Sequence, residues 1–137
     1  MKYFIFIVAL ILFSFALVRF FMKSNSNSKD SFSSQLTSTK FSSVIIDKGN
    51  QKLNVPVSAD FVIYNTGGTD LYILKVEPDC RCTVAAFSKD PIHSKDSSII
   101  VLKYDAHNPG PFQSSAVVRT NTSNSPTLLI FRGIVEP

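Results

Sequence analysis

Short β-rich runs separated by turn residues fill the chain from Phe41 onward. This pattern of predicted strands and turns constrains the fold more than any other feature of the sequence. β-branched and aromatic residues dominate the runs, and no segment after Lys40 shows sustained helical periodicity. Turn-forming residues lie between them, for example at 48–50, 66–68 and 108–111. The pattern predicts strands over residues 41–47, 55–65, 70–77, 83–87, 97–105, 112–120 and 127–135. About seven strands, with a turn roughly every ten to fifteen residues, are typical of an all-β, immunoglobulin-like β-sandwich.

The run 97–105 has the clearest two-residue alternation. Ile100, Leu102 and Tyr104 share one face, and the opposite face ends in the charged Lys103. We therefore assign the first face to the core. The chain has two cysteines and no Trp, whereas an antibody-type sandwich places two cysteines on different strands with a Trp between them. We expect a core held by apolar packing alone, which a domain of this size can form.

The N-terminus carries a different signal, because residues 3–18 contain no charge. Sixteen helical residues reach about 24 Å, and continuing to residue 22 gives about 30 Å, the thickness of a hydrocarbon core. This predicts a membrane helix over 1–23, a Ser/Asn-rich flexible linker over 24–40 and the sandwich domain over 41–137. A cleaved signal peptide is the alternative, but a cut after Ala16 would leave an apolar new terminus. A third interpretation is that residues 3–18 form a helix buried in the protein core.

Charge is uneven along the chain. The formal net charge is +4, and residues 1–30 supply +3 of it through four bases against Asp30. The remainder shows no basic stripe of its own, so we expect no nucleic-acid partner. Bases lie on both sides of the apolar run, with more of them after it. Taken literally, the positive-inside rule would place the C-terminal domain in the cytoplasm.

Cys80-Arg81-Cys82 is the one chemically pointed motif. On an extended strand the two β-carbons would lie roughly 6.5–7 Å apart, whereas a disulfide needs about 3.5–4.5 Å, so a bridge would require a kinked backbone. Three interpretations follow: a structural pair, a redox-active or strained disulfide, or a thiolate pair that binds Cu(I) or Zn(II). Arg81 favours the thiolate form, while the neighbouring Asp79 opposes it.

Other catalytic or ligand-binding patterns are not apparent in the sequence. The two histidines, His93 and His107, lie in predicted turns, and we do not expect them to join the cysteines as metal ligands. The acidic residues are scattered, and neither a Gly-rich phosphate loop nor a G-x-S-x-G motif occurs. We therefore expect a protein that is not an enzyme, without a cofactor or a small-molecule substrate.

Residues 59–92 and 99–136 resemble the exported bacterial domains grouped as domain of unknown function 1573. Phe61, Ile63 and Asn65-Thr66-Gly67 match the family's opening F-x-F-x-N-T-G pattern, with Ile63 in place of an aromatic residue. Later matches, in order, are Leu71, Ile73, Cys80, Cys82, Thr83, Pro91, Ile92, Tyr104, Gly110, Phe112, Asn121, Gly133 and Val135. Two departures are Arg81, where the family has Gly, and Ser94-Lys95, where it has Pro-Gly. We expect a differently shaped turn at the second.

The resemblance implies an exported, often membrane-attached Ig-like sandwich in bacteria similar to the Bacteroidetes, related to major-sperm-protein and cilium-associated modules. It implies no activity for Cys80 or Cys82. On this ground we expect the domain on the extracytoplasmic, periplasmic side of the inner membrane, against the charge count. Cleavage of the N-terminal segment would instead release the domain from the membrane. The leading hypothesis is a membrane-anchored module that binds or scaffolds an unidentified protein. The alternative is a thiol redox or soft-metal (Cu/Zn) handling protein using Cys80 and Cys82.

Overall fold

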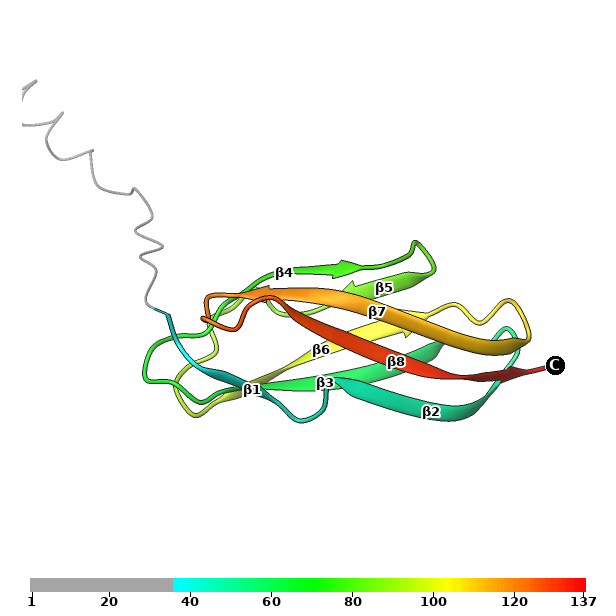
Figure 1. Cartoon of the computed structure of the whole chain (residues 1–137), viewed down its shortest axis with the longest axis horizontal. Helices are drawn as coiled ribbons and strands as arrows, with labels where there is room; N and C mark the ends of the chain where they lie inside the picture. The colour runs from blue at the N-terminus through cyan, green and yellow to red at the C-terminus, as the bar shows by residue number, and fades with distance from the viewer. Residues whose placement is uncertain (1–35) are drawn as a thin grey trace, which may run out of the picture. The chain divides into compact units, whose positions relative to one another are not determined.

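The computed structural model describes residues 36–137, which form two packed four-stranded sheets (Figure 1). The first sheet has the strand order β1-β3-β6-β5 and the second the order β2-β8-β7-β4. Neighbouring strands are antiparallel except β2 and β8, which run parallel. The strands are β1 (Thr39–Phe41), β2 (Ile45–Lys52), β3 (Val57–Asn65), β4 (Ile73–Pro78), β5 (Thr83–Ala86), β6 (Ser97–Tyr104), β7 (Gly110–Thr120) and β8 (Thr127–Glu136).

The predicted two-layer all-β fold is confirmed, but it has eight strands in place of about seven. The predicted strand 41–47 is divided between the end of β1 and the start of β2, which belong to different sheets. At the division, the side-chain oxygen of Ser43 accepts a hydrogen bond from the backbone N–H of Ile45 at 3.2 Å. Such local serine bonds support a turn, and the chain uses this one to cross between the sheets.

β2 runs through residues 48–50, which the sequence pattern predicted to be a turn. Gly49 has a φ of 62°, and the register of β2 against β8 shifts between Asp47 and Asn50. The Asp47 carboxylate accepts a hydrogen bond from the Gly49 N–H at 3.0 Å. The glycine therefore forms a β-bulge, since bulges and turns draw on the same left-handed conformation.

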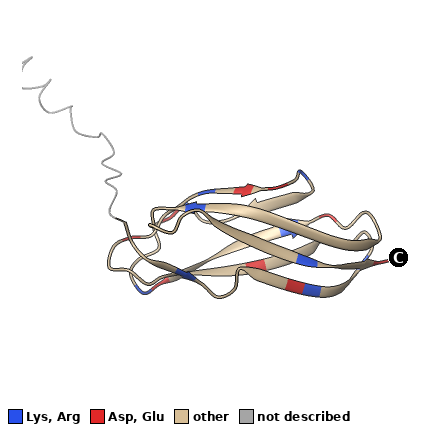
Figure 2. Ribbon diagram, viewed as in Figure 1, with Lys and Arg blue, Asp and Glu red and all other residues tan. Residues whose placement is uncertain are grey.

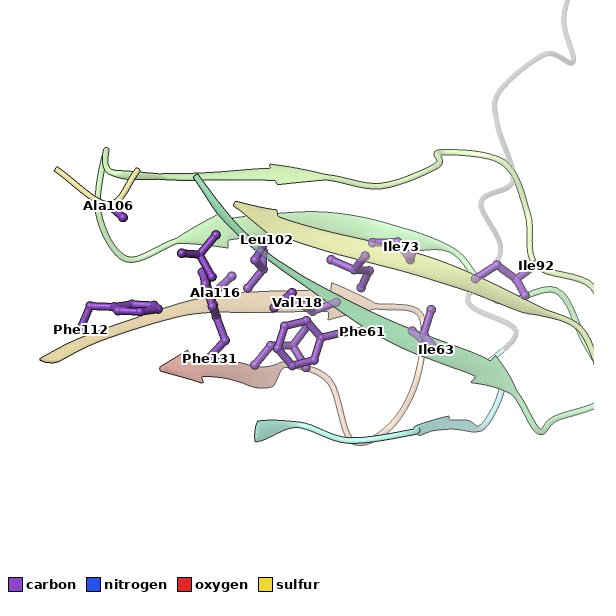
Figure 3. Close-up of a cluster of buried hydrophobic side chains, with 14 of the residues drawn as sticks. Phe61, Ile63, Ile73, Ile92, Leu102, Ala106, Phe112, Ala116, Val118 and Phe131 are labelled. Atoms are coloured by element: carbon purple, nitrogen blue, oxygen red, sulfur yellow. The ribbon is translucent and has the colours of Figure 1, made fainter. Parts of the chain in front are cut away.

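The core faces follow the predicted alternation. Ile100 and Leu102 are fully buried, whereas Ile99 on the opposite face of β6 is 49% exposed, and Tyr104 is partly buried. Figure 3 shows core side chains such as Phe61 between the two sheets. The expected assignment of this strand's inner face is confirmed.

An aromatic row joins the two sheets within this core. The rings of Tyr104 on β6 and Phe112 on β7 stack with centroids 4.5 Å apart, and Phe112 meets Phe131 on β8 edge to face at 5.8 Å. Phe131 is fully buried. Because Tyr104 belongs to the first sheet and the other two rings to the second, these contacts hold the layers together.

Asn65 at the end of β3 is a buried polar centre of the fold. Its amide nitrogen donates to the carbonyls of Thr69 (2.7 Å) and Ile92 (2.8 Å). Its amide oxygen accepts from the Gly67 N–H and the Thr37 hydroxyl, each at 3.0 Å. At Gly67 a β-carbon would lie 2.1 Å from the Thr37 hydroxyl oxygen, so only glycine fits there. The Asn-Thr-Gly motif thus closes this end of the sandwich through its own hydrogen bonds.

The turn before β6 carries the second departure from the family pattern. Lys95 has a φ of 69°, in the left-handed region that favours glycine. The turn therefore keeps a glycine-type backbone at that position although the residue is a lysine.

The sandwich also begins earlier than the predicted boundary at residue 41. Thr37 forms a bridge with Thr122, and β1 starts at Thr39, so the end of the predicted linker is part of the first sheet. The predicted membrane helix over 1–23 lies outside the described residues. Within 36–137, no helix is long and apolar enough to span a membrane.

Candidate functional site

The Cys80-Arg81-Cys82 motif forms the turn that carries the chain from β4 in the second sheet to β5 in the first (Figure 1). The Thr83 N–H donates to the Cys80 carbonyl at 3.3 Å, which closes a four-residue turn. The Cα atoms of the two cysteines are 5.3 Å apart, and their sulfurs form a disulfide. The extended geometry considered from the sequence does not apply, because the backbone turns before β5 begins.

Both sheets hold this turn in place. Before it, the Asp79 N–H donates to the Ser115 carbonyl on β7 at 3.0 Å, and the Asp79 carboxylate accepts from the Ser115 hydroxyl at 2.9 Å. After it, the Cys82 carbonyl accepts from the N–H of Asp105, just beyond β6, at 3.1 Å. The disulfide is therefore fixed at its two flanks by strands from different layers.

Two buried hydroxyls lie beneath the disulfide. The Thr83 hydroxyl oxygen is 3.5 Å from the Cys80 sulfur, and it forms a hydrogen bond with the Ser114 hydroxyl. Thr83 is 5% exposed and Ser114 is fully buried. Sequence reasoning missed Ser114. Its inward position in the alternation of β7, between Phe112 and Ala116, was the signal that could have identified it.

The two cysteine residues differ in exposure. Cys80 is partly buried, whereas Arg81 and Cys82 are exposed. Metal binding by this pair requires thiolates, and in the structure the two sulfurs are joined to each other. Residues 36–137 contain no group of three or more His, Cys, Asp or Glu side chains that could hold a metal ion.

The two histidines bond elsewhere. His107 Nδ1 is 3.5 Å from the Asn54 side-chain oxygen, and His93 Nδ1 is 2.9 Å from an Asp70 carboxylate oxygen. The hydrogen bond and charge of Asp70 raise the pKa of His93 above its ordinary value of 6.5. Because the folded-state pKa is the raised one, this pair stabilises the fold below about pH 6.5 and loses its effect as the pH rises through that pKa. Both side chains are well exposed, so the effect is small.

The outer face of the first sheet carries an apolar row, defined here as Tyr64 and Val62 on β3, Ile99 and Val101 on β6, and Val84 on β5. Val62 lies directly opposite Ile99 in the β3–β6 ladder. Tyr64, Ile99 and Val84 are 41%, 49% and 61% exposed, and the two other members are partly buried. The row crosses the sheet to its edge strand β5, and no element of residues 36–137 forms a third layer over it.

The outer face of the second sheet carries ion pairs, and Figure 2 shows the charged positions along its strands. Arg132 contacts Asp47 at 3.2 Å, and Glu77 contacts both Lys75 and Arg119. The hydrogen bonds from Lys75 and Arg119 lower the pKa of Glu77. This face is a mixed, charged surface. Charged residues also border the apolar row on the first sheet, where Asp60 lies opposite Val101 and Lys103 lies opposite Val84.

A model of the family described as "Protein of unknown function (DUF1573)" matches residues 39–135. No curated protein matches the sequence.

Solved structures show the same fold at low sequence identity. A protein of unknown function from Porphyromonas gingivalis is 15% identical with a TM-score of 0.64, over 79% of this chain and 51% of that one. This chain therefore spans about half of that protein. The ASH/PapD-like domain of human CEP192 is 10% identical with a TM-score of 0.57, over 74% and 87% of the two chains. The YadV chaperone is 15% identical with a TM-score of 0.52, over 72% and 52%. These likenesses show that the chain has the fold of PapD-like Ig-like domains.

Proposed function

The chain belongs to the DUF1573 family, whose function is not known, and on that premise we propose that it is a non-enzymatic protein-binding module. The observation that carries this proposal is the apolar row on the first sheet. Contiguous apolar patches exposed on a globular domain mark interaction surfaces. The row ends at β5, whose outer edge has no strand partner within residues 36–137. An extended segment of a partner could add there while its side chains pack on the row.

We place the module on the extracytoplasmic side of a membrane, anchored by residues 1–23. The uncharged run 3–18 supports the anchor. The Cys80–Cys82 disulfide supports the location, since disulfides persist in oxidising compartments and are rare in the cytosol. This consideration outweighs the positive-inside count, which favours the cytoplasm.

Thiol labelling of intact cells that produce the full chain tests the location. Treatment with a membrane-impermeant reductant followed by an impermeant maleimide should label Cys80 and Cys82, the only cysteines of the chain. Omitting the reductant should abolish the labelling, because the sulfurs are joined. Labelling that appears only after cell lysis would place the domain in the cytoplasm.

Site-specific photo-crosslinking in intact cells tests the binding role. A photoreactive amino acid at Ile99, in the middle of the apolar row, should give discrete adducts to a partner protein. The matched control is the same amino acid at Leu128, because Ile99 is 49% and Leu128 50% exposed but Leu128 lies in the second sheet. We expect several-fold more adduct from position 99 than from position 128.

The specificity of that adduct has a further check. Adding Val84→Asp to the position-99 variant places a charge at the β5 end of the row, on a side chain that is 61% exposed, and should reduce the adduct without unfolding the domain. Equal adduct yields from positions 99 and 128 would contradict the proposed surface.

A further inference from the structure

The Cys80–Cys82 disulfide closes a very short segment, with a sequence separation of only two. A disulfide stabilises a fold mainly by restricting the unfolded chain, and this effect falls as the closed loop becomes shorter. The sandwich also has its own apolar core, drawn from both sheets. Stapling the fold is therefore a weak reason for this bond, and its surroundings point to a chemical role.

The two cysteine residues are unequally exposed. Cys82 is exposed and Cys80 is partly buried, so an incoming thiolate reaches the Cys82 sulfur first. Arg81 is exposed between the two cysteines and brings a positive charge to the place where an anionic thiolate approaches. Attack at Cys82 makes the Cys80 sulfur the leaving group.

A hydrogen-bond donor lies close enough to the Cys80 sulfur to stabilise it as the leaving thiolate. When Cys80 becomes a thiolate, the Thr83 hydroxyl, 3.5 Å away, can donate to it while it remains in contact with the Ser114 hydroxyl. Stabilising the leaving thiolate accelerates thiol–disulfide exchange. The nearby Asp79 carboxylate accepts hydrogen bonds from the Ser115 N–H and hydroxyl on β7, and its other oxygen accepts from the Ser114 hydroxyl at 3.4 Å.

We propose that the Cys80–Cys82 pair is a reversible redox site that accepts two electrons from the dithiol of another protein. The partner's first thiolate attacks the Cys82 sulfur, forming a mixed disulfide and releasing Cys80 as a thiolate. The partner's second thiolate then attacks the partner's own sulfur in that mixed disulfide and releases Cys82. The partner leaves as a disulfide, and its two thiol protons and two electrons reside on Cys80 and Cys82. This role does not depend on the apolar row, and failure of either proposal leaves the other standing.

The rate of reduction tests the role of the hydroxyl pair. The full chain in detergent is treated with dithiothreitol, and free thiols are trapped over time with a maleimide that shifts the mass. The wild-type bond should be reduced completely while circular dichroism stays unchanged. Thr83→Val should slow the reduction about five- to tenfold, since it removes the donor to the leaving sulfur. Thr120→Val is the matched control, because it removes a buried hydroxyl bonded only to Thr122, and it should leave the rate unchanged.

A second pair of variants tests the asymmetry even where Thr83→Val does not fold. Cys80→Ser leaves the exposed Cys82, and Cys82→Ser leaves the partly buried Cys80. With oxidised glutathione, we expect Cys80→Ser to form the mixed disulfide several-fold faster. A wild-type bond that resists dithiothreitol until the chain is unfolded would overturn the proposal. Equal glutathione rates for the two cysteine variants would overturn the order of attack and, with it, the role of Cys80 as leaving group.

Discussion

Asn65→Ala is expected to lower the free energy of unfolding by about 3–5 kcal/mol, because it removes four hydrogen bonds that each contribute roughly 0.5–1.5 kcal/mol. The side chain is 1% exposed and uses both amide atoms. Its loss removes four hydrogen bonds at once: those to the carbonyls of Thr69 and Ile92 and those from the Gly67 N–H and the Thr37 hydroxyl. Urea denaturation of the full chain, followed by circular dichroism, measures the change as a lower midpoint at constant slope.

Asn124→Ala is the matched control for this measurement. Asn124 is exposed in the turn before β8, where its side-chain oxygen accepts only from the neighbouring Ser123 hydroxyl. We expect a change within about 0.5 kcal/mol. A loss at Asn65 no larger than the loss at Asn124 would show that the hydrogen bonds of Asn65 do not hold this end of the sandwich.

Phe131→Ala is also expected to cost about 3–5 kcal/mol, because it opens a cavity in a packed core. The ring is fully buried and meets Phe112 edge to face, so its removal also weakens the aromatic row that joins the sheets. The same denaturation experiment measures the loss.

Leu128→Ala on the same strand provides the comparison for Phe131. Leu128 is 50% exposed on the outer face of β8, and its truncation should cost less than about 1 kcal/mol. Equal losses at the two positions would mean that the core is not organised around the inward face of β8.

The sequence pattern predicted the fold class and the inward face of β6, because alternation with a period of two reports directly on which side is buried. It did not predict that residues 37–40, three of which are Ser or Thr, belong to the folded domain. The partners that order this segment are distant in the sequence: Asn65 binds Thr37 28 residues away, and Thr122 pairs with the same threonine. A composition typical of a linker therefore becomes part of a sheet only in the folded context.

The candidate site was likewise predicted only in part from the sequence. The cysteines and Arg81 were evident from the sequence, but their backbone geometry was not. The turn depends on hydrogen bonds between Asp79 and Ser115, which lies on β7, and between Cys82 and Asp105, which lies just beyond β6. The Thr83–Ser114 hydroxyl pair likewise joins residues 31 positions apart. Local spacing alone could not decide between an open pair of thiols and a closed bond.

The parallel pairing of β2 with β8 has a mechanical consequence. The two strands keep register from Ile45 opposite Ile130 to Lys52 opposite Glu136, apart from the bulge. Tension between residue 36 and the C-terminus would pull β2 from its beginning and β8 from its end. The hydrogen bonds between β2 and β8 would then be loaded in shear. They would have to break together, and not one after another. The domain is thus built to resist stretching along the chain between its two ends.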